Sequence, residues 1–185
     1  LDYSKHIRRK INMQNIVWEP SSYHLKKSNL AKYIAFINSN YDKDFKNYDE
    51  LYNWSVDDIS NFWESISIFT KIKFSSLPDS IYKKHNSFIK TQWFEGAKLN
   101  FAENLLKYKD DSIAIEYFCE NKLKGKITYR QLFDRVSNCA YYLESLGIKK
   151  GDRVAGFMPN IPEAIIAMLA SSAIGAVWSS CSPDF

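Results

Sequence analysis

The sequence predicts an α/β fold in which parallel βαβ units follow a helical N-terminal segment. Two observations predict it. From Ser112 onward, the spacing of apolar side chains changes repeatedly from about two residues, typical of strands, to about 3.6, typical of helices. Each helical stretch there also begins with a residue suited to the first turn, Thr128 in one case and Pro162 in the other. Strands that alternate with helices in this way are typical of a parallel sheet.

The N-terminal part predicts an irregular arm followed by two amphipathic helices. Residues 1–27 show no clear hydrophobic period and are expected to lie on the surface. The first helix is expected to begin at the cap Ser28, and the second at Ser55, which with Asp58 has the spacing of an acidic capping box. The expected apolar stripes are Leu30, Tyr33, Ile34, Ile37 and Tyr41 in the first helix and Ile59, Phe62, Trp63 and Ile66 in the second.

A polar stretch from Leu77 to Asn86 predicts a boundary in the middle of the chain. Beyond it, Asn100 and Glu103 have the spacing of a helix cap, and a short helix is expected to run through Leu106. We favour this structural role over a catalytic role for either side chain.

The C-terminal part predicts the elements of the sheet. Strands are expected near 113–118, 153–158 and 176–180, with an additional short strand at 126–127. Helices are expected over 128–146, from a Thr128–Gln131 capping box to a stop at Gly147, and over 162–174, from Pro162 to Gly175. The second of these helices is apolar nearly all round, so it is expected to be buried.

Composition excludes several classes of function. The net charge of +4 is mild, and the basic cluster at residues 5–10 fits a solvated surface better than nucleic-acid binding. The three cysteines and three histidines show no metal-binding or disulfide spacing, which fits a reducing cytoplasm. The longest apolar run, residues 164–178, is shorter than the roughly 20 residues that a membrane-spanning helix needs.

Spacing alone predicts no catalytic constellation. The sequence contains no GxSxG, no Walker phosphate loop and no GxGxxG. Ligands of open α/β sheets bind at the carboxyl ends of the strands, which here are followed by residues 159–163 and 179–185. Cys181, in the second of these segments, is expected to be a small buried residue and not a nucleophile.

Four stretches together resemble one family of enzymes. They are YNWSVDDISNFWESI, WFEGAKLNFAENLL, ITYRQLFDRV and LGIKKGDRVAGFMPNIPEAIIAMLASSAIGAVWSSCSPDF. In this order they are similar to acetoacetyl-CoA synthetases, members of the acyl-adenylate-forming superfamily. ITYRQL resembles the first core motif of the superfamily, and AIGAVWSSCSPDF contains the stretch that resembles the second core motif.

The resemblance implies a division into two regions. Residues 1–90 would be the helical N-terminal extension of acyl-CoA synthetases, and residues 91–185 the first part of the AMP-binding domain. The family's ATP loop, hinge and catalytic lysine come later in the chain. The resemblance therefore implies an N-terminal piece, inactive by itself, whose partner is the rest of its own chain. The whole enzyme would be cytoplasmic, bind neither nucleic acid nor membrane, and use ATP, Mg²⁺, CoA and acetoacetate.

The resemblance also implies a binding site at the last loop. In acetyl-CoA synthetases, the residues after the matching strand form part of the wall along the pantetheine arm of CoA. The resemblance assigns this place to Ser182, Pro183 and Asp184. Two structural roles stay open beside that one: Asp184 as the cap of a following helix, and Pro183 as the residue that shapes the turn. A synthetase for acetate or another short acyl group also stays open, as does a stand-alone binding or interaction module.

Overall fold

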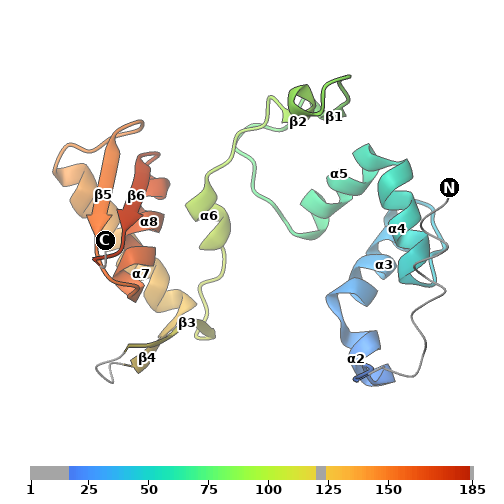
Figure 1. Ribbon diagram of the computed structural model, residues 1–185, viewed down its shortest axis with the longest axis horizontal. Coiled ribbons are helices and arrows are strands. Elements are labelled where there is room, and N and C mark those ends of the chain that lie inside the picture. Colours follow the sequence, from blue (N-terminus) through green and yellow to red (C-terminus); the bar gives the residue numbers. More distant parts are fainter. Residues whose placement is uncertain (1–16, 120–123, 184–185) are drawn as a thin grey trace. The chain divides into compact units, whose positions relative to one another are not determined.

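The computed structural model describes residues 17–119 and 124–183 (Figure 1). They form two compact units, one ending at Thr70 and the other beginning at Lys71. A division of the chain into functional domains between residues 90 and 91 stays a prediction.

The first unit contains helices and no strand within its described residues. Its helices are α2 (Ser22–Lys27), α3 (Asn29–Asn40), α4 (Tyr48–Asp57) and α5 (Ile59–Phe69). The predicted cap of α3 is confirmed, because the Ser28 hydroxyl oxygen accepts a hydrogen bond from the Ala31 N–H at 3.1 Å. The prediction of an irregular arm over residues 1–27 is wrong for its last six residues, because they form α2, which begins after the cap Ser21. Residues 1–16, with the basic cluster, lie outside the described residues.

The predicted capping box of Ser55 and Asp58 is wrong. Helix α4 begins further upstream, at the cap Asn47, so Ser55 lies inside a helix that has already formed, and its hydroxyl donates to the Tyr52 carbonyl at 2.7 Å. The break comes at Asp58, whose backbone leaves helical geometry and whose carboxylate accepts from the Asn61 N–H at 3.3 Å. Asp58 is therefore the cap of α5, three residues later than predicted.

Helices α3, α4 and α5 share an aromatic core. Its buried members are Tyr33, Ile37, Leu51 and Trp54. The buried Ser65 hydroxyl donates to the Phe62 carbonyl of its own helix at 2.6 Å and lies 2.6 Å from the Tyr33 hydroxyl of α3, so both helices satisfy it. The expected stripe side chains Ile34, Tyr41, Phe62 and Ile66 pack against this core, as the sequence predicts. Two other expected members, Leu30 and Trp63, are exposed, so the stripes are wrong at these positions.

The second unit begins with a hairpin that the sequence analysis missed. Strand β1 (Ser80–Lys83) pairs antiparallel with β2 (Gln92–Glu95), inside and just after the stretch expected to be a polar boundary. The short helix α6 (Phe101–Leu105) follows, and its predicted cap is confirmed, because the Asn100 side-chain oxygen accepts from the Glu103 N–H at 3.0 Å.

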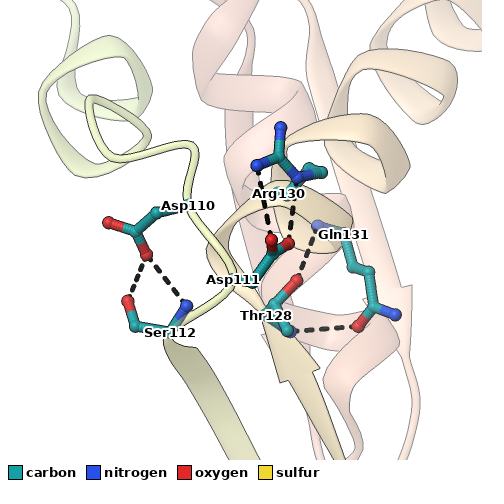
Figure 2. A network of polar contacts seen from close by, with 6 residues as sticks. All are labelled: Asp110, Asp111, Ser112, Thr128, Arg130 and Gln131. Atoms are coloured by element: carbon teal, nitrogen blue, oxygen red, sulfur yellow. Dashed lines mark hydrogen bonds and ion pairs between the residues drawn. The ribbon is translucent and has the colours of Figure 1, made fainter.

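A second hairpin, β3 (Ile113–Phe118) with β4 (Lys124–Thr128), leads into the long helix α7 (Tyr129–Ser145). The predicted capping box is confirmed: the Gln131 N–H donates to Thr128 Oγ1 at 3.2 Å, and the Thr128 N–H donates to Gln131 Oε1 at 3.0 Å. Figure 2 shows this box beside an ion pair of Arg130 and Asp111, whose Nε and Oδ1 atoms are 2.9 Å apart. The loop before β3 is thereby tied to the start of α7.

The last part is a βαβ unit. Strands β5 (Arg153–Phe157) and β6 (Val177–Cys181) are parallel and are joined by α8 (Pro162–Ala173), which packs on both strands and on α7 (Figure 1). The predicted parallel pair is confirmed. The expectation that 113–118 belongs to the same sheet is wrong, because its described pairing is with β4, in an antiparallel hairpin closed by a short connection.

The core of the second unit lies between α6, α7, α8 and β4. Its buried members are Ala102, Leu106, Ile127, Leu132, Val136, Ile166, Leu169 and Ala170. Helix α8 is less buried than its apolar sequence predicts, since Ile165 is 37% exposed. The α/β class predicted from the sequence is confirmed.

Candidate site at the ends of strands β5 and β6

The two strand ends that the sequence analysis singled out lie side by side. Phe157 and Cys181 are register partners at the end of the parallel pair. The Met158 N–H donates to the Cys181 carbonyl at 3.3 Å, one residue beyond β5. The loops that begin at Met158 and Ser182 therefore leave the same edge of the sheet, where open α/β sheets bind ligands.

Backbone groups dominate the first of these loops. Helix α8 starts at Pro162, and its N-cap Ile161 offers no side-chain hydrogen bond. The Ala164 N–H turns back to the Ile161 carbonyl at 3.0 Å, and Glu163 in the first turn is exposed. This loop presents main-chain groups, the Glu163 carboxylate and the exposed side chain of Asn160 at the sheet edge.

A close contact shapes the sheet next to this edge. A Cβ atom added at Gly156 would lie 2.6 Å from the Trp178 ring and 3.1 Å from the Met158 sulfur. Gly156 and Trp178 come from adjacent strands, so only glycine lets the indole approach the neighbouring strand this closely. This contact was not predicted from the sequence, where an isolated glycine within an apolar strand is its one signal.

The face of the parallel pair opposite α8, here called the bare face, is not covered by any of the described residues. Alternate side chains of the two strands are exposed there, namely Arg153, Ala155, Phe157, Val177, Ser179 and Cys181. Phe157 is 67% exposed and Val177 55%. Parallel sheets are ordinarily covered on both faces, whereas the described residues cover this pair on one face only.

Cys181 lies on this bare face, and the prediction that it is a small buried residue is wrong. The strand pattern explains the error: Cys181 follows Val177 and Ser179 on the uncovered side of the sheet. Cys139, on α7, is half-buried, and burial raises the pKa of its thiol.

The predicted CoA-wall residues are only partly described. Ser182 is half-buried and Pro183 is exposed, whereas Asp184 lies outside the described residues. The structure thus places Ser182 and Pro183 directly after the edge formed by β5 and β6. Their role in binding stays a prediction.

The described residues offer neither a metal site nor a membrane span. Within residues 17–119 and 124–183, no three His, Cys, Asp or Glu side chains gather as metal ligands would. Among the helices in the same ranges, none has the length and apolar character needed to cross a bilayer.

Two known protein families match parts of the chain. Residues 101–185 match the AMP-binding enzyme family, and residues 48–105 match the family described as acetyl-coenzyme A synthetase N-terminus. The first match covers the βαβ unit and the candidate edge. The second covers α4, α5 and the first hairpin of the second unit.

The particular relatives are acetoacetyl-CoA synthetases. The chain is 38% identical over 181 residues to that of Macaca fascicularis and 35% identical over 169 residues to that of Rhizobium meliloti. The solved acetoacetyl-CoA synthetase from Streptomyces lividans superimposes with a TM-score of 0.79 at 32% identity, over 91% of this chain and 26% of its own. The resemblance found in the sequence is confirmed. The match to the macaque enzyme covers 96% of this chain but only 27% of that enzyme.

Proposed function

We propose that this chain forms the N-terminal part of an ATP-dependent acetoacetyl-CoA synthetase, an acid–thiol ligase. The supporting observation is that similarity to these enzymes runs through both compact units, at 38% identity over 181 residues. A match limited to the βαβ unit would support only the broader class of AMP-binding enzymes.

The proposed reaction has two steps. The acetoacetate carboxylate attacks the α-phosphorus of Mg-ATP, which gives acetoacetyl-AMP and releases pyrophosphate. The CoA thiol then attacks the acyl carbon, loses its proton and displaces AMP, which gives acetoacetyl-CoA. Both steps need groups that stabilise negative charge on phosphoryl and acyl oxygens.

The described residues do not contain those groups in one place. The sheet edge offers the backbone of residues 159–164 and no cluster of cationic side chains. Mg²⁺ would enter with ATP, since proteins usually hold it through one or two carboxylates and the phosphates of the nucleotide. The proposed contribution of this chain is the scaffold and, through Ser182, Pro183 and Asp184, one wall for CoA.

The proposed partner is the rest of the same protein. The bare face of β5 and β6 carries two large exposed apolar side chains, Phe157 and Val177, in a kind of sheet that is ordinarily covered. Further parallel strands and a covering layer from the same protein would bury this face. We also propose a cytoplasmic location, because the three cysteines show no disulfide spacing.

The test is acyl-dependent exchange of pyrophosphate into ATP, measured on the whole protein and on the 185-residue chain. We expect exchange with acetoacetate ahead of acetate in the whole protein, and none above a buffer blank in the chain alone. Exchange that prefers acetate or propionate would identify a short-chain acyl-CoA synthetase instead. If the whole protein shows none with any short acid, the adenylation proposal is wrong and an interaction module becomes the better explanation.

A further inference from the structure

The hairpin of β1 and β2 carries two large apolar side chains at its tip. The connection between the two strands contains a short 3₁₀ helix, η2 (Phe88–Lys90). Phe88 and Ile89, which open it, are 86% and 87% exposed. Single apolar side chains are common on protein surfaces, whereas neighbouring large ones that are almost fully exposed mark a candidate surface for binding.

The backbone that carries these side chains is ordered by contacts within the hairpin. The Thr91 N–H donates to the Phe88 carbonyl at 3.1 Å and closes the turn. Behind the tip, the register partners Tyr82 and Trp93 have their ring centres 4.7 Å apart. Because the turn is already formed, a contact made by Phe88 and Ile89 would cost less conformational entropy than one made by a flexible loop.

The tip is also accessible in the described part of the chain. Strands β1 and β2 pack on each other, and no helix or further strand in the described ranges packs broadly on either of them. The buried core of the second unit and the side chains packed against it include no residue of this hairpin. The described structure therefore leaves the two apolar side chains free to contact a partner.

The charge around the tip has one sign. Residues 80–94 contain three lysines and neither aspartate nor glutamate. The Lys83 ammonium lies 3.7 Å from a Glu95 carboxylate oxygen, whereas Lys84 and Lys90 are exposed and form no ion pair with any described residue. Two uncompensated positive charges thus flank Phe88 and Ile89 in the sequence.

We propose that this tip docks on the surface of an anionic lipid bilayer. Phe88 and Ile89 would enter the boundary between headgroups and acyl chains, and the ammonium groups of Lys84 and Lys90 would lie among the lipid phosphates. An acidic protein segment would satisfy the two lysines but leave the apolar side chains in water, whereas an anionic bilayer satisfies both. The contact would be weak and reversible, since it has few charges and little apolar area. It departs from the expectation, drawn from the resemblance, that the whole enzyme binds no membrane.

The experiment is co-sedimentation of the whole protein with sucrose-loaded vesicles of phosphatidylcholine, with and without one quarter phosphatidylserine. We expect binding to the anionic vesicles only, and release of most of it when the salt concentration rises from about 0.1 M to about 1 M. Lys84→Gln with Lys90→Gln should weaken binding roughly thirtyfold, about fivefold for each lysine near the surface. Phe88→Ser with Ile89→Ser should weaken it about tenfold or more, because the apolar contact is lost.

Two matched double variants serve as controls. Lys26→Gln with Lys32→Gln removes two exposed lysines from the first unit, and Tyr141→Ser with Tyr142→Ser removes two exposed rings from α7. Neither should change vesicle binding.

Four results would each overturn the proposal: equal binding to both kinds of vesicle, no binding to either, unchanged affinity in a folded tip variant, or binding to polyglutamate without binding to the anionic vesicles. The last would identify an acidic protein segment as the partner. If the Phe88→Ser, Ile89→Ser protein fails to fold, the lysine variant decides. The assay uses neither ATP nor CoA, so its outcome is independent of the synthetase proposal.

Discussion

The side chain of Asn100 donates a hydrogen bond from Nδ2 to the carbonyl of Ala173 at 2.9 Å, across 73 residues of sequence. The same nitrogen lies 3.1 Å from the Ser172 carbonyl, and the side-chain oxygen caps α6. One amide therefore satisfies an N–H at the start of α6 and two carbonyls at the end of α8, where a helix leaves its last carbonyls without partners. This geometry joins the segment before the second hairpin to the βαβ unit.

Asn100→Asp should destabilise the second unit, because the variant keeps the capping oxygen but loses both donors and sets a carboxylate against two carbonyl oxygens. We expect a loss of about 1–3 kcal/mol in the free energy of unfolding, measured by urea denaturation near neutral pH. The matched control is Asn47→Asp at the cap of α4, where the asparagine acts through its oxygen. That change should be close to neutral; equal losses at the two positions would contradict the bridging role.

Gly156→Ala should destabilise the parallel pair, because the added methyl group would overlap the Trp178 ring. Overpacking of this kind costs about 1–3 kcal/mol. In a double-mutant cycle by chemical denaturation, Trp178→Leu should cost less in the Gly156→Ala background than in the unchanged protein. Strictly additive losses would show that the two residues do not compete for the same space.

The cap of α5 should make the first unit sensitive to acid. The hydrogen bond from the Asn61 side chain lowers the pKa of Asp58 below its ordinary value of 3.8. A lowered folded-state pKa means that the stabilisation is complete above the unfolded value and is lost as the pH falls through the folded one. Asp58→Asn keeps a neutral cap, so its deficit in unfolding free energy relative to the unchanged protein should shrink as the pH falls below 3.8 and vanish once the folded-state carboxylate is protonated. Urea titrations at several pH values check this. A deficit in unfolding free energy that does not change as the pH falls would contradict the capping role of the Asp58 carboxylate.

The exposed thiol of Cys181 should react with a disulfide reagent before that of Cys139. Cys139 is half-buried and burial raises the pKa of its thiol, so little thiolate forms there near neutral pH. Labelling of the native chain, followed by peptide mass spectrometry, should find Cys181 modified first. Cys181→Ser should remove the fast phase of labelling. If a fast phase remains in this variant, another thiol is the reactive one.

Changes in the last loop should act on the second half-reaction alone, if Ser182, Pro183 and Asp184 line the CoA site. In the whole enzyme, Ser182→Tyr or Asp184→Ala should raise KM for CoA and leave acetoacetate-dependent pyrophosphate exchange nearly intact, because only thioester formation uses CoA. Steady-state kinetics and exchange assays on the same preparations make the comparison. Parallel losses in both, together with a lower Tm, would show that the loop is structural.

Local signals in the sequence determined where most elements begin and end. Ser28, Asn100 and the Thr128–Gln131 box act within one helical turn, and the glycine after α7 has the left-handed φ, +85°, that favours glycine. The chemistry of a cap is complete within about four residues, so sequence alone suffices to locate it. The cap at Asp58 was misplaced because Ser55 offered an equally good local pattern, and only the upstream start of α4 excluded it.

The tertiary structure decided which segments meet. The alternation of side chains in 113–118 does not show which strand it pairs with. A hairpin with β4 and a place in the parallel sheet would use the same strand pattern. The sequence analysis identified Asn100 as a cap, but its bonds to α8 depend on a contact across more than seventy residues. Cys181 was misjudged for the same reason: burial on a given face of a strand depends on what packs there, and this requires coordinates.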